Sequence, residues 1–573
     1  MRSHRSQSSF ALPPKDSLLF VVALSLWLFA LLFFNPRLLI LTIGPEPLPA
    51  KICVMLFVIC LDIFWFYAIF HMTILTFSYF SRKPNDLTEK VPICDGISKS
   101  CPRVALLYVT YNDFQEEAAL TCVKQRYEHC HLFILDDSTE EAYRARINAF
   151  AQTHRGRVTV IRRKERAFYK AGNLNHALSL IAVDYEFFSV SDADSRIPPE
   201  FIIKLLPYFV VPDIGFVQAM NIVNPQQPSY LAQAMGFNLQ LHYRRYVVPR
   251  ERYGFVMFHG HGALLRTDVW RKTGGFPEIV SEDLGFSTRM RVMGYYGVLA
   301  ADCICYEDYP PTYRHYRRRT EKWIKGTMEF LSREFFALLR AKNVFWFEKI
   351  DVFVSGISLA LGFPFLLFLL MGSIALPLYF MSFRASGPVF IPAIPEGKTV
   401  VSLVTGLRYN TYWTLDYYLI MLLTIFYPLV PVLIDLVRRP VKMLRYMSIS
   451  TYLFLSTLVW VSYQSIFFLW KRKADFLVTA HEGREKQSGA AATSFFLARR
   501  HRVVAAAEYA FGALFALLTA GTNNLWLVSV AAALISSPLL VQYGMESRPL
   551  RLLLHVPFIG SVAVLFFIGH SLR

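Results

Sequence analysis

The sequence has few cysteines and they are scattered. Eight occur in 573 residues, and only Cys303 and Cys305 lie close together. This spacing indicates neither a zinc site nor a disulfide framework. Most of the cysteines fall in segments that we expect in the cytosol, where thiols stay reduced.

Acidic residues are scarce relative to basic ones, 42 against 60, which gives a formal net charge of +18. Such a charge can indicate nucleic acid binding, but here basic residues gather beside apolar runs, as at 438–445 and 471–473. Positive-inside topology and attraction to anionic lipid explain this placement better. We therefore expect membrane lipids, and no nucleic acid, as partners.

The chain is not polar enough for an ordinary soluble protein, since 54% of its residues are hydrophobic and its mean hydropathy is +0.35. At 573 residues it is also too long for one typical domain. These properties predict a polytopic membrane protein with a water-soluble part.

The first apolar run, 17–34, could be a signal peptide or an anchor. No small-residue cleavage site follows it, and a second apolar run follows at 52–77. We expect a transmembrane hairpin over 1–80 with the N-terminus inside, which returns the chain to the cytosol.

Residues 101–346 have the residue pattern of a globular α/β domain. Short apolar runs at 104–112, 131–137, 157–163 and 185–194 alternate with helix-like segments at 115–125 and 140–153. Strands that alternate with helices predict a parallel sheet, and ligands of such sheets bind beyond the carboxyl ends of the strands.

Asp192 and Asp194 follow one of these predicted strands, in YEFFSVSDADS. Two carboxylates at this spacing can turn toward one hard cation, Mg²⁺ or Mn²⁺, which keeps positions open for substrate phosphates. Alone the pattern is weak, because aspartate is common in turns after strands.

A second segment, KAGNLNHAL at 170–178, lies between the acidic strand ends. Gly172 permits a tight turn there and Asn173 or Asn175 can cap a helix, so a loop and helix cap is the simplest interpretation. The spacing of Leu174, Ala177, Leu178 and Ile181 suits a helix that faces the sheet.

The order YN, LDDS, KAGNLNHAL, SDAD, HGHGALLR, SED and a basic segment with Trp resembles the processive family two glycosyltransferases of the cellulose synthase group. The resemblance covers about 100–330, with a further piece near 476. It implies a cytosolic GT-A, Rossmann-like domain that inverts an α-linked nucleotide sugar, normally a UDP-sugar, and extends a β-linked polymer.

The resemblance also implies roles for the acidic strand ends. It places Asp136 at the uracil and ribose, Lys170 at the nucleotide sugar, and Asp192 and Asp194 at the metal-binding DxD. Asp192 also belongs to the expected nucleotide-sugar site. A divalent ion at this place would offset charge that builds on the departing diphosphate.

The segment 254–297 matches the family's acceptor and base motifs. The resemblance implies that His259, Gly260 and His261 line the acceptor sugar; no third ligand is spaced to make the histidines a zinc site. Glu282 and Asp283 match the catalytic acidic pair, with Asp283 as general base. Both could also cap a helix over 284–293, whose dipole would lower the pKa of the base.

The basic stretch 313–326 departs from the family pattern Gln-x-x-Arg-Trp. Arg319 and Lys322 can still meet a diphosphate, although Lys is a point charge where Arg would give a fork. Trp323 can stack on the acceptor sugar. Without the resemblance, the stretch would be a basic face on a helix against the membrane.

The second half is predicted to lie in the membrane. We expect a first channel part over 351–446 with spans at 352–380 and 415–436, and a flat interfacial helix at 448–470 within a unit of 447–502. The resemblance places a gating loop at 476–479, with Thr479 at the nucleotide. Runs at 503–520, 525–541 and 552–570 complete about seven spans.

Together these features predict a transferase domain over 81–350 that makes a β-glycan from a UDP-sugar, with UDP-glucose first, and moves it across the plasma membrane, as in a bacterial inner membrane. A chitin- or hyaluronan-like synthase, a non-processive transferase acting on lipid, and an exporter with a degenerate transferase domain are the alternatives. The sequence does not identify partner subunits or a homo-oligomer.

Overall fold

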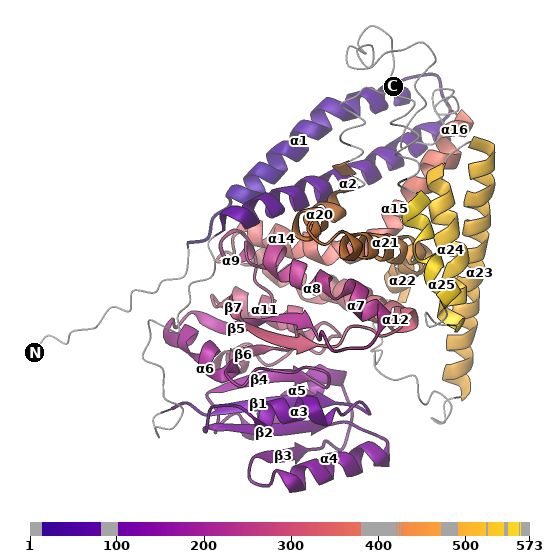
Figure 1. Ribbon diagram of the computed structural model, residues 1–573. Helices are drawn as coiled ribbons and strands as arrows, with labels where there is room; N and C mark the ends of the chain where they lie inside the picture. The colour runs from indigo at the N-terminus through magenta and orange to yellow at the C-terminus, as the bar shows by residue number, and fades with distance from the viewer. Residues whose placement is uncertain are drawn as a thin grey trace, which may run out of the picture.

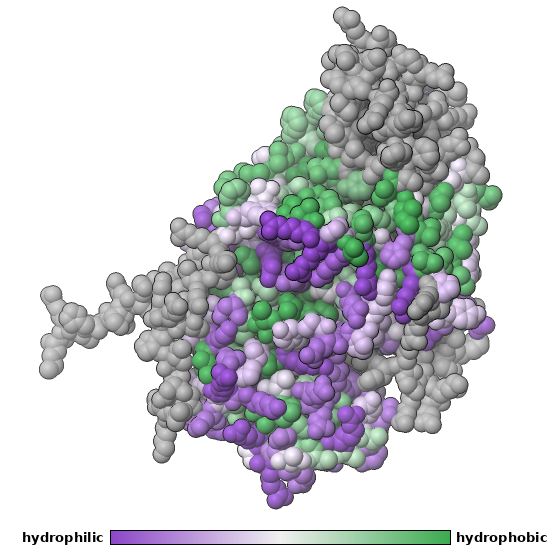
Figure 2. Space-filling model, viewed as in Figure 1, coloured by the Kyte–Doolittle hydropathy of each residue, from purple (hydrophilic) through white to green (hydrophobic). Residues whose placement is uncertain are grey.

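The computed structural model describes residues 14–81, 101–379, 426–471, 491–522, 525–543 and 548–560, with the single positions 420, 423, 424 and 562. Its lower half in Figure 1 is an α/β domain, and its upper half is built of helices. Figure 2 shows mainly hydrophilic side chains over the first and many hydrophobic ones over the second.

The α/β domain contains a seven-stranded sheet in the order β3-β2-β1-β4-β6-β5-β7. The strands are β1 (Val104–Thr110), β2 (Cys130–Asp136), β3 (Val158–Ile161), β4 (Phe187–Asp192), β5 (Ile214–Val223), β6 (Ala263–Arg266) and β7 (Tyr296–Glu307). The four strands expected from apolar runs, β1 to β4, are all present.

The sheet is mixed, so the prediction of a parallel sheet is wrong in one respect. β1 pairs in parallel with β2 and β4, β2 with β3, and β5 with β7. β6 runs antiparallel to both β4 and β5. A strand that runs parallel to its neighbour needs a crossover connection, usually a helix. The short β6 instead follows directly from the glycine-containing turn at 259–262.

Helices cover both faces of this sheet. One face packs on α3 (Glu116–Val123), α4 (Glu141–Thr153) and α6 (Phe201–Leu205). The other packs on α5 (Tyr169–Ile181), α10 (Thr267–Lys272) and α11 (Glu282–Val292). Burial on both sides explains why the strands are near-continuous apolar runs.

The segment 170–178 is helical throughout, so the predicted turn and cap are wrong. Asn173 lies inside α5 and donates to the Leu135 carbonyl at 3.2 Å, while Asn175 donates to the Phe276 carbonyl at 2.9 Å. Gly172 allows close approach instead of a turn: a Cβ there would collide with the Ala167 carbonyl oxygen. The predicted apolar face of this helix is buried.

The remaining helices lie beyond the β7 edge of the sheet, with α7, α8 and α12 between the sheet and most of the others (Figure 1). They are α1 (Leu18–Leu39), α2 (Leu48–Phe80), α7 (Tyr230–Met235), α8 (Phe237–His242), α9 (Arg250–Tyr253), α12 (Tyr313–Arg333), α13 (Phe335–Arg340), α14 (Trp346–Ile357), α15 (Gly362–Leu370), α16 (Leu376–Tyr379), α20 (Val430–Leu436), α21 (Pro440–Ser456), α22 (Leu458–Lys471), α23 (Ala491–Thr522), α24 (Leu525–Tyr543) and α25 (Arg548–Leu553).

Three helices in the described part of the chain are long and apolar enough to cross a membrane: Leu18–Pro36, Leu48–Phe80 and Arg502–Thr519. Two bent pairs, Trp346–Ala360 with Gly362–Ala375 and Pro440–Ser456 with Leu458–Trp470, raise the number to five if each is one span. The count of about seven stays a prediction.

Three further sequence expectations concern the helical half and the cysteines. The stretch 448–470 is not one helix, because α21 and α22 meet at a bend of 44°. Most of 415–429, the end of 552–570 and the loop 476–479 with Thr479 lie outside the described residues. Cys101 is disulfide-bonded, so not every cysteine of the α/β domain is a free thiol.

We expect Gly172→Ala to lower the thermal unfolding midpoint in detergent. The collision with Ala167 costs about 1–3 kcal/mol, which outweighs a helix-propensity gain of up to about 1 kcal/mol. Gly44→Ala is the control, because its Cβ would come no closer than 3.9 Å to a neighbouring atom. Equal midpoints for the two variants would contradict the packing argument.

Candidate active site

A cavity of about 1330 Å³ lies between the carboxyl edge of the sheet and the helices. Eleven of the thirteen residues that the sequence singles out line it: Lys170, Asp192, Asp194, His259, Gly260, His261, Glu282, Asp283, Arg319, Lys322 and Trp323. Residues far apart in the chain therefore form one site.

The ammonium group of Lys170 is the centre of this site. Its Nζ lies 2.6 Å from Asp192 Oδ1 and 3.5 Å from Glu282 Oε1, and it donates to the Gly260 carbonyl at 3.1 Å. Burial alone would lower the pKa of Lys170, but Asp192 and Glu282 outweigh it and raise that pKa. Lys170 thus stays charged.

The entry to α5 holds Lys170 in place through an unusual backbone. Phe168 and Tyr169 both have positive φ values, 54° and 49°, in the left-handed region. Such residues cost about 1–3 kcal/mol each and persist only where surrounding structure fixes them. We interpret this strain as a means of aiming Lys170 at the acidic groups.

The two aspartates after β4 have opposite electrostatics. Burial would raise the pKa of Asp192, but Lys170 and His261 lower it to about 2. Burial, together with the negative charges of Asp192 and Glu307, raises the pKa of Asp194 to about 7. Asp194 therefore lacks a positive partner strong enough to offset its neighbours.

Asp192 and Asp194 fit a divalent cation. Their oxygens are the hard ligands that Mg²⁺ and Mn²⁺ prefer, and a cation would remove the repulsion that raises the pKa of Asp194. Within the described ranges, no three histidine, cysteine or acidic side chains are arranged to hold a metal.

Glu282 and Asp283 begin helix α11, as their alternative interpretation predicted, and they also line the cavity. Asp283 Oδ1 accepts from the backbone N–H of Leu284 at 2.8 Å. Burial raises the pKa of both carboxyls, against the opposing effect of Lys170 and Lys322. The expected lowering by the helix start is thus outweighed by desolvation.

Gly260 brings the acceptor turn against these acids. It has a φ of +84°, and a Cβ there would lie 3.3 Å from Asp283 Oδ2 and 3.4 Å from Lys170 Nζ. Any side chain would therefore be strained and would press on the base and the lysine. The glycine keeps this space open.

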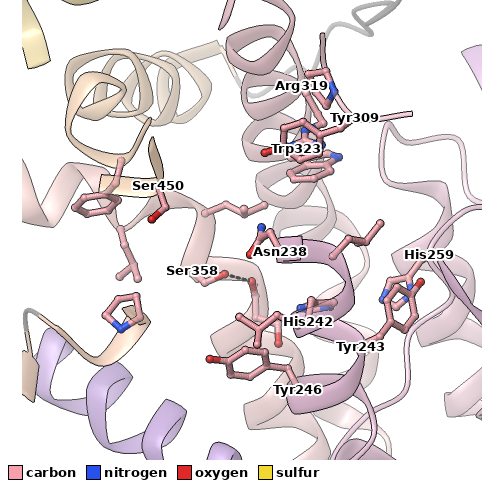
Figure 3. Close-up of a pocket in the computed structure, with 18 of the residues that line it drawn as sticks. Asn238, His242, Tyr243, Tyr246, His259, Tyr309, Arg319, Trp323, Ser358 and Ser450 are labelled. Atoms are coloured by element: carbon pink, nitrogen blue, oxygen red, sulfur yellow. Dashed lines mark hydrogen bonds between the residues drawn. The ribbon is translucent and has the colours of Figure 1, made fainter. Parts of the chain in front are cut away.

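The two histidines of the turn have different surroundings. Burial lowers the pKa of His259, whose Nδ1 lies 2.8 Å from Tyr243 Oη (Figure 3). His261 Nε2 lies 3.0 Å from Glu307, and this contact outweighs burial and raises the pKa of His261 to about 9. His261 Nδ1 lies 3.2 Å from Ser195 Oγ, so both of its nitrogens are engaged.

Helix α12 contributes an aromatic and basic wall. The Arg319 guanidinium lies 4.5 Å from the centre of the Trp323 ring and 4.3 Å from that of Tyr309. Figure 3 shows these three side chains together at one end of the pocket. Trp323 is 46% exposed, which leaves ring surface for another planar or sugar group.

Asp136 does not join this cavity. Its carboxylate is fully buried, accepts from Arg162 Nε at 2.7 Å and from the Ser138 backbone at 2.8 Å, and does not line the pocket. The predicted convergence of Asp136 with the other acids is therefore absent from this structure. Its place at a nucleotide stays a prediction.

Sequence reasoning missed a further acidic pair at the site. Glu307 ends β7, Asp308 follows it, and both line the cavity beside Asp192 and Asp194. The signal was the one used for Asp192: acidic residues at the end of an apolar strand-like run. His242, Tyr243 and Tyr246, which lie toward the helices in Figure 3, had no such signal.

Residues 188–470 match the family description Glycosyl transferase family group 2. The chain therefore carries a family 2 glycosyltransferase domain, with a GT-A-like mixed α/β fold. The prediction of a glycosyltransferase is confirmed at the level of this domain.

Two plant proteins are similar to part of the chain. Probable glucomannan 4-beta-mannosyltransferase 1 of Arabidopsis thaliana is 26% identical over 321 residues, which is 52% of this chain and 58% of the relative. Probable glucomannan 4-beta-mannosyltransferase 6 of Oryza sativa subsp. japonica is 26% identical over 260 residues, 43% and 44% of the two chains. The chain thus spans about half the length of these curated relatives, which are named for mannosyl rather than glucosyl transfer.

Solved structures resemble it more distantly. A mannosyltransferase from Pyrobaculum calidifontis, PcManGT, in complex with GDP-Man and Mn²⁺, has a TM-score of 0.42 and 19% identity, covering 66% of this chain and 98% of that one. S. aureus TarS 1–349 in complex with UDP has a TM-score of 0.30 and 16% identity, covering 42% and 66%.

We expect Glu282→Gln to raise the thermal midpoint relative to wild type by an amount that grows from about pH 5 to about pH 8. The pKa of Glu282 is raised on folding, so the folded state holds a proton that the unfolded state releases above about pH 4.3. Wild-type stability falls as pH rises through that window, and Gln lacks this loss. A difference that shrinks with rising pH would contradict the assignment.

Proposed function

We propose that the protein is an inverting, processive glycosyltransferase that moves a hexose from a nucleotide sugar onto a growing β-linked polysaccharide and passes the product across the membrane. The observation that carries the proposal is one continuous cavity: it joins Asp192, Asp194, Asp283 and Trp323 to helices that are apolar enough to span a bilayer. The proposal extends the domain assignment from sugar transfer to export of the polymer.

The helical side of the cavity supports a path for a polymer. Aromatic side chains from several helices line it, among them Phe64, Tyr67, Phe365, Tyr427, Tyr446 and Phe558. Aromatic rings offer large, rigid surfaces with polar edges, which suit sugar faces without binding any one unit tightly. Figure 3 shows Asn238, His242 and Tyr246 between these helices and the Trp323 end.

Asp283 would act as the general base toward the acceptor hydroxyl. A raised carboxyl pKa makes it a stronger base. Lys170, Arg319 and Lys322 would face the diphosphate, and Asp192 with Asp194 would hold Mg²⁺ or Mn²⁺, which supplies positive charge to the leaving group. Thr479 and Asp136 would complete the nucleotide site.

UDP-glucose and GDP-mannose are the two donors to compare. The motif set resembles glucan synthases and favours UDP-glucose, whereas the plant relatives are named as β-mannosyltransferases. Both donors carry an α-linked hexose on a diphosphate, so the proposed chemistry serves either. We place the enzyme in the plasma membrane, with the transferase domain on the cytosolic side.

The function is tested with purified full-length protein in nanodiscs, given Mg²⁺ or Mn²⁺ and radiolabelled UDP-glucose, GDP-mannose, or other UDP-sugars in turn. We expect one donor to yield polymer of many units, and sizing of the product separates it from single-sugar transfer to lipid. Product of one or two sugars with every donor would overturn processivity.

We expect Asp283→Asn to lower kcat by about 10²–10⁴-fold, the usual contribution of a positioned base. Binding of the nucleotide, measured by calorimetry, should stay near wild type, because the change leaves Lys170 and the two aspartates of β4 in place. Asp268→Asn is the control, since this exposed residue pairs only with Lys272 in helix α10. Near-normal turnover by the Asp283 variant would refute the assignment of the base.

A further inference from the structure

Helix α12 has two opposite functional faces. His315, Arg319, Lys322 and Trp323 line the cavity and recur at helical spacing along one side. Tyr313 and Arg317 lie about half a turn away and are both buried. The orientation of α12 about its axis therefore determines which of its side chains face the cavity.

Arg317 fixes the far face to the C-terminal helices. Its guanidinium donates to Glu508 of α23 at 3.2 Å and lies 2.9 Å from the second Glu508 oxygen. It also donates to Ser537 of α24 at 3.0 Å and lies 4.4 Å from the Trp460 ring centre of α22. One side chain thus contacts three helices.

Tyr313, one turn earlier on the same face, adds to this attachment. Its hydroxyl donates to Ser456 Oγ at 2.8 Å and lies 2.9 Å from Ser537 Oγ. Ser537 therefore contacts both Tyr313 and Arg317. The α12 face is held by a connected polar network rather than by apolar packing alone.

Glu508 lies within Arg502–Thr519, one of the candidate membrane spans. A carboxylate in such a helix is costly unless it is paired, and among the described residues its ion-pair partner is Arg317 of the transferase domain. Breaking such a buried pair leaves an uncompensated charge. The pair therefore makes the position of α12 depend on the C-terminal helices.

We propose that Arg317 and Glu508 are a positioning pair through which the C-terminal helices set Arg319, Lys322 and Trp323 against the reacting groups. The inference rests on the proposed transferase function. Neither residue touches the cavity, so each acts only through the face of α12 that does. Displacement of such a face by about 1 Å can cost about 100-fold in rate.

The test is a double-mutant cycle on kcat with full-length protein in nanodiscs. Glu508→Gln keeps the shape but removes the charge, and we expect kcat to fall at least about 10-fold in the wild-type background. In a Trp323→Ala background the same change should cost clearly less than in wild type, because one of the three positioned side chains is already gone. Multiplicative losses in the two backgrounds would overturn the proposal.

A second readout does not need activity. Amide hydrogen exchange in α12 should speed up in Glu508→Gln. The double variant Arg317→Gln, Glu508→Gln leaves no unpaired charge, so it serves if the single variant unfolds. We expect the same faster exchange in it. Glu200→Gln is the matched control, since it breaks an ion pair with Arg126 that does not involve α12. Unchanged exchange in α12 overturns the inference; wild-type protein that transfers no sugar overturns the proposed function instead.

Discussion

Compensation of buried negative charge is the constraint on which this structure depends. Asp192, Asp194, Glu282 and Asp283 lie around one cavity, and Lys170 reaches two of them directly. Carboxylates this close in a low-dielectric site repel one another, and burial raises the pKa of three of the four. The proposed cation and diphosphate sites would account for the retention of these buried charges.

The same constraint explains why elements far apart in sequence are held so firmly. Lys170 comes from α5, Asp192 from β4, Gly260 from a turn, and Glu282 and Asp283 from α11. Left-handed residues at 168 and 169 and a glycine with positive φ at 260 bring these groups within contact of one another. Displacement of any one would leave a buried charge uncompensated, which is more costly than the local strain.

The sequence predicted the parts of this site that follow from local pattern. Acidic residues after apolar strands pointed to Asp192 and Asp194, and the resemblance to the family two transferases pointed to Asp283. Three features depend on contacts between distant residues, which no local pattern reports. These are the close approach behind Gly172, the Arg162 that holds Asp136 inside the domain, and the antiparallel β6.

The charged centre explains transfer but not the choice of sugar. Glucose and mannose differ in the orientation of one hydroxyl. The proposed metal, lysine and base would act instead on the diphosphate, which both donors carry, and on the acceptor oxygen. Discrimination of a hydroxyl needs neutral hydrogen-bonding groups in fixed positions, since an unpaired buried partner penalises the wrong epimer. Polar side chains of this kind in the cavity include His259, which contacts Tyr243, and Asn238, which contacts Tyr446. We therefore expect the choice of sugar to depend on such polar side chains, of which His259 alone belongs to a motif quoted for the family.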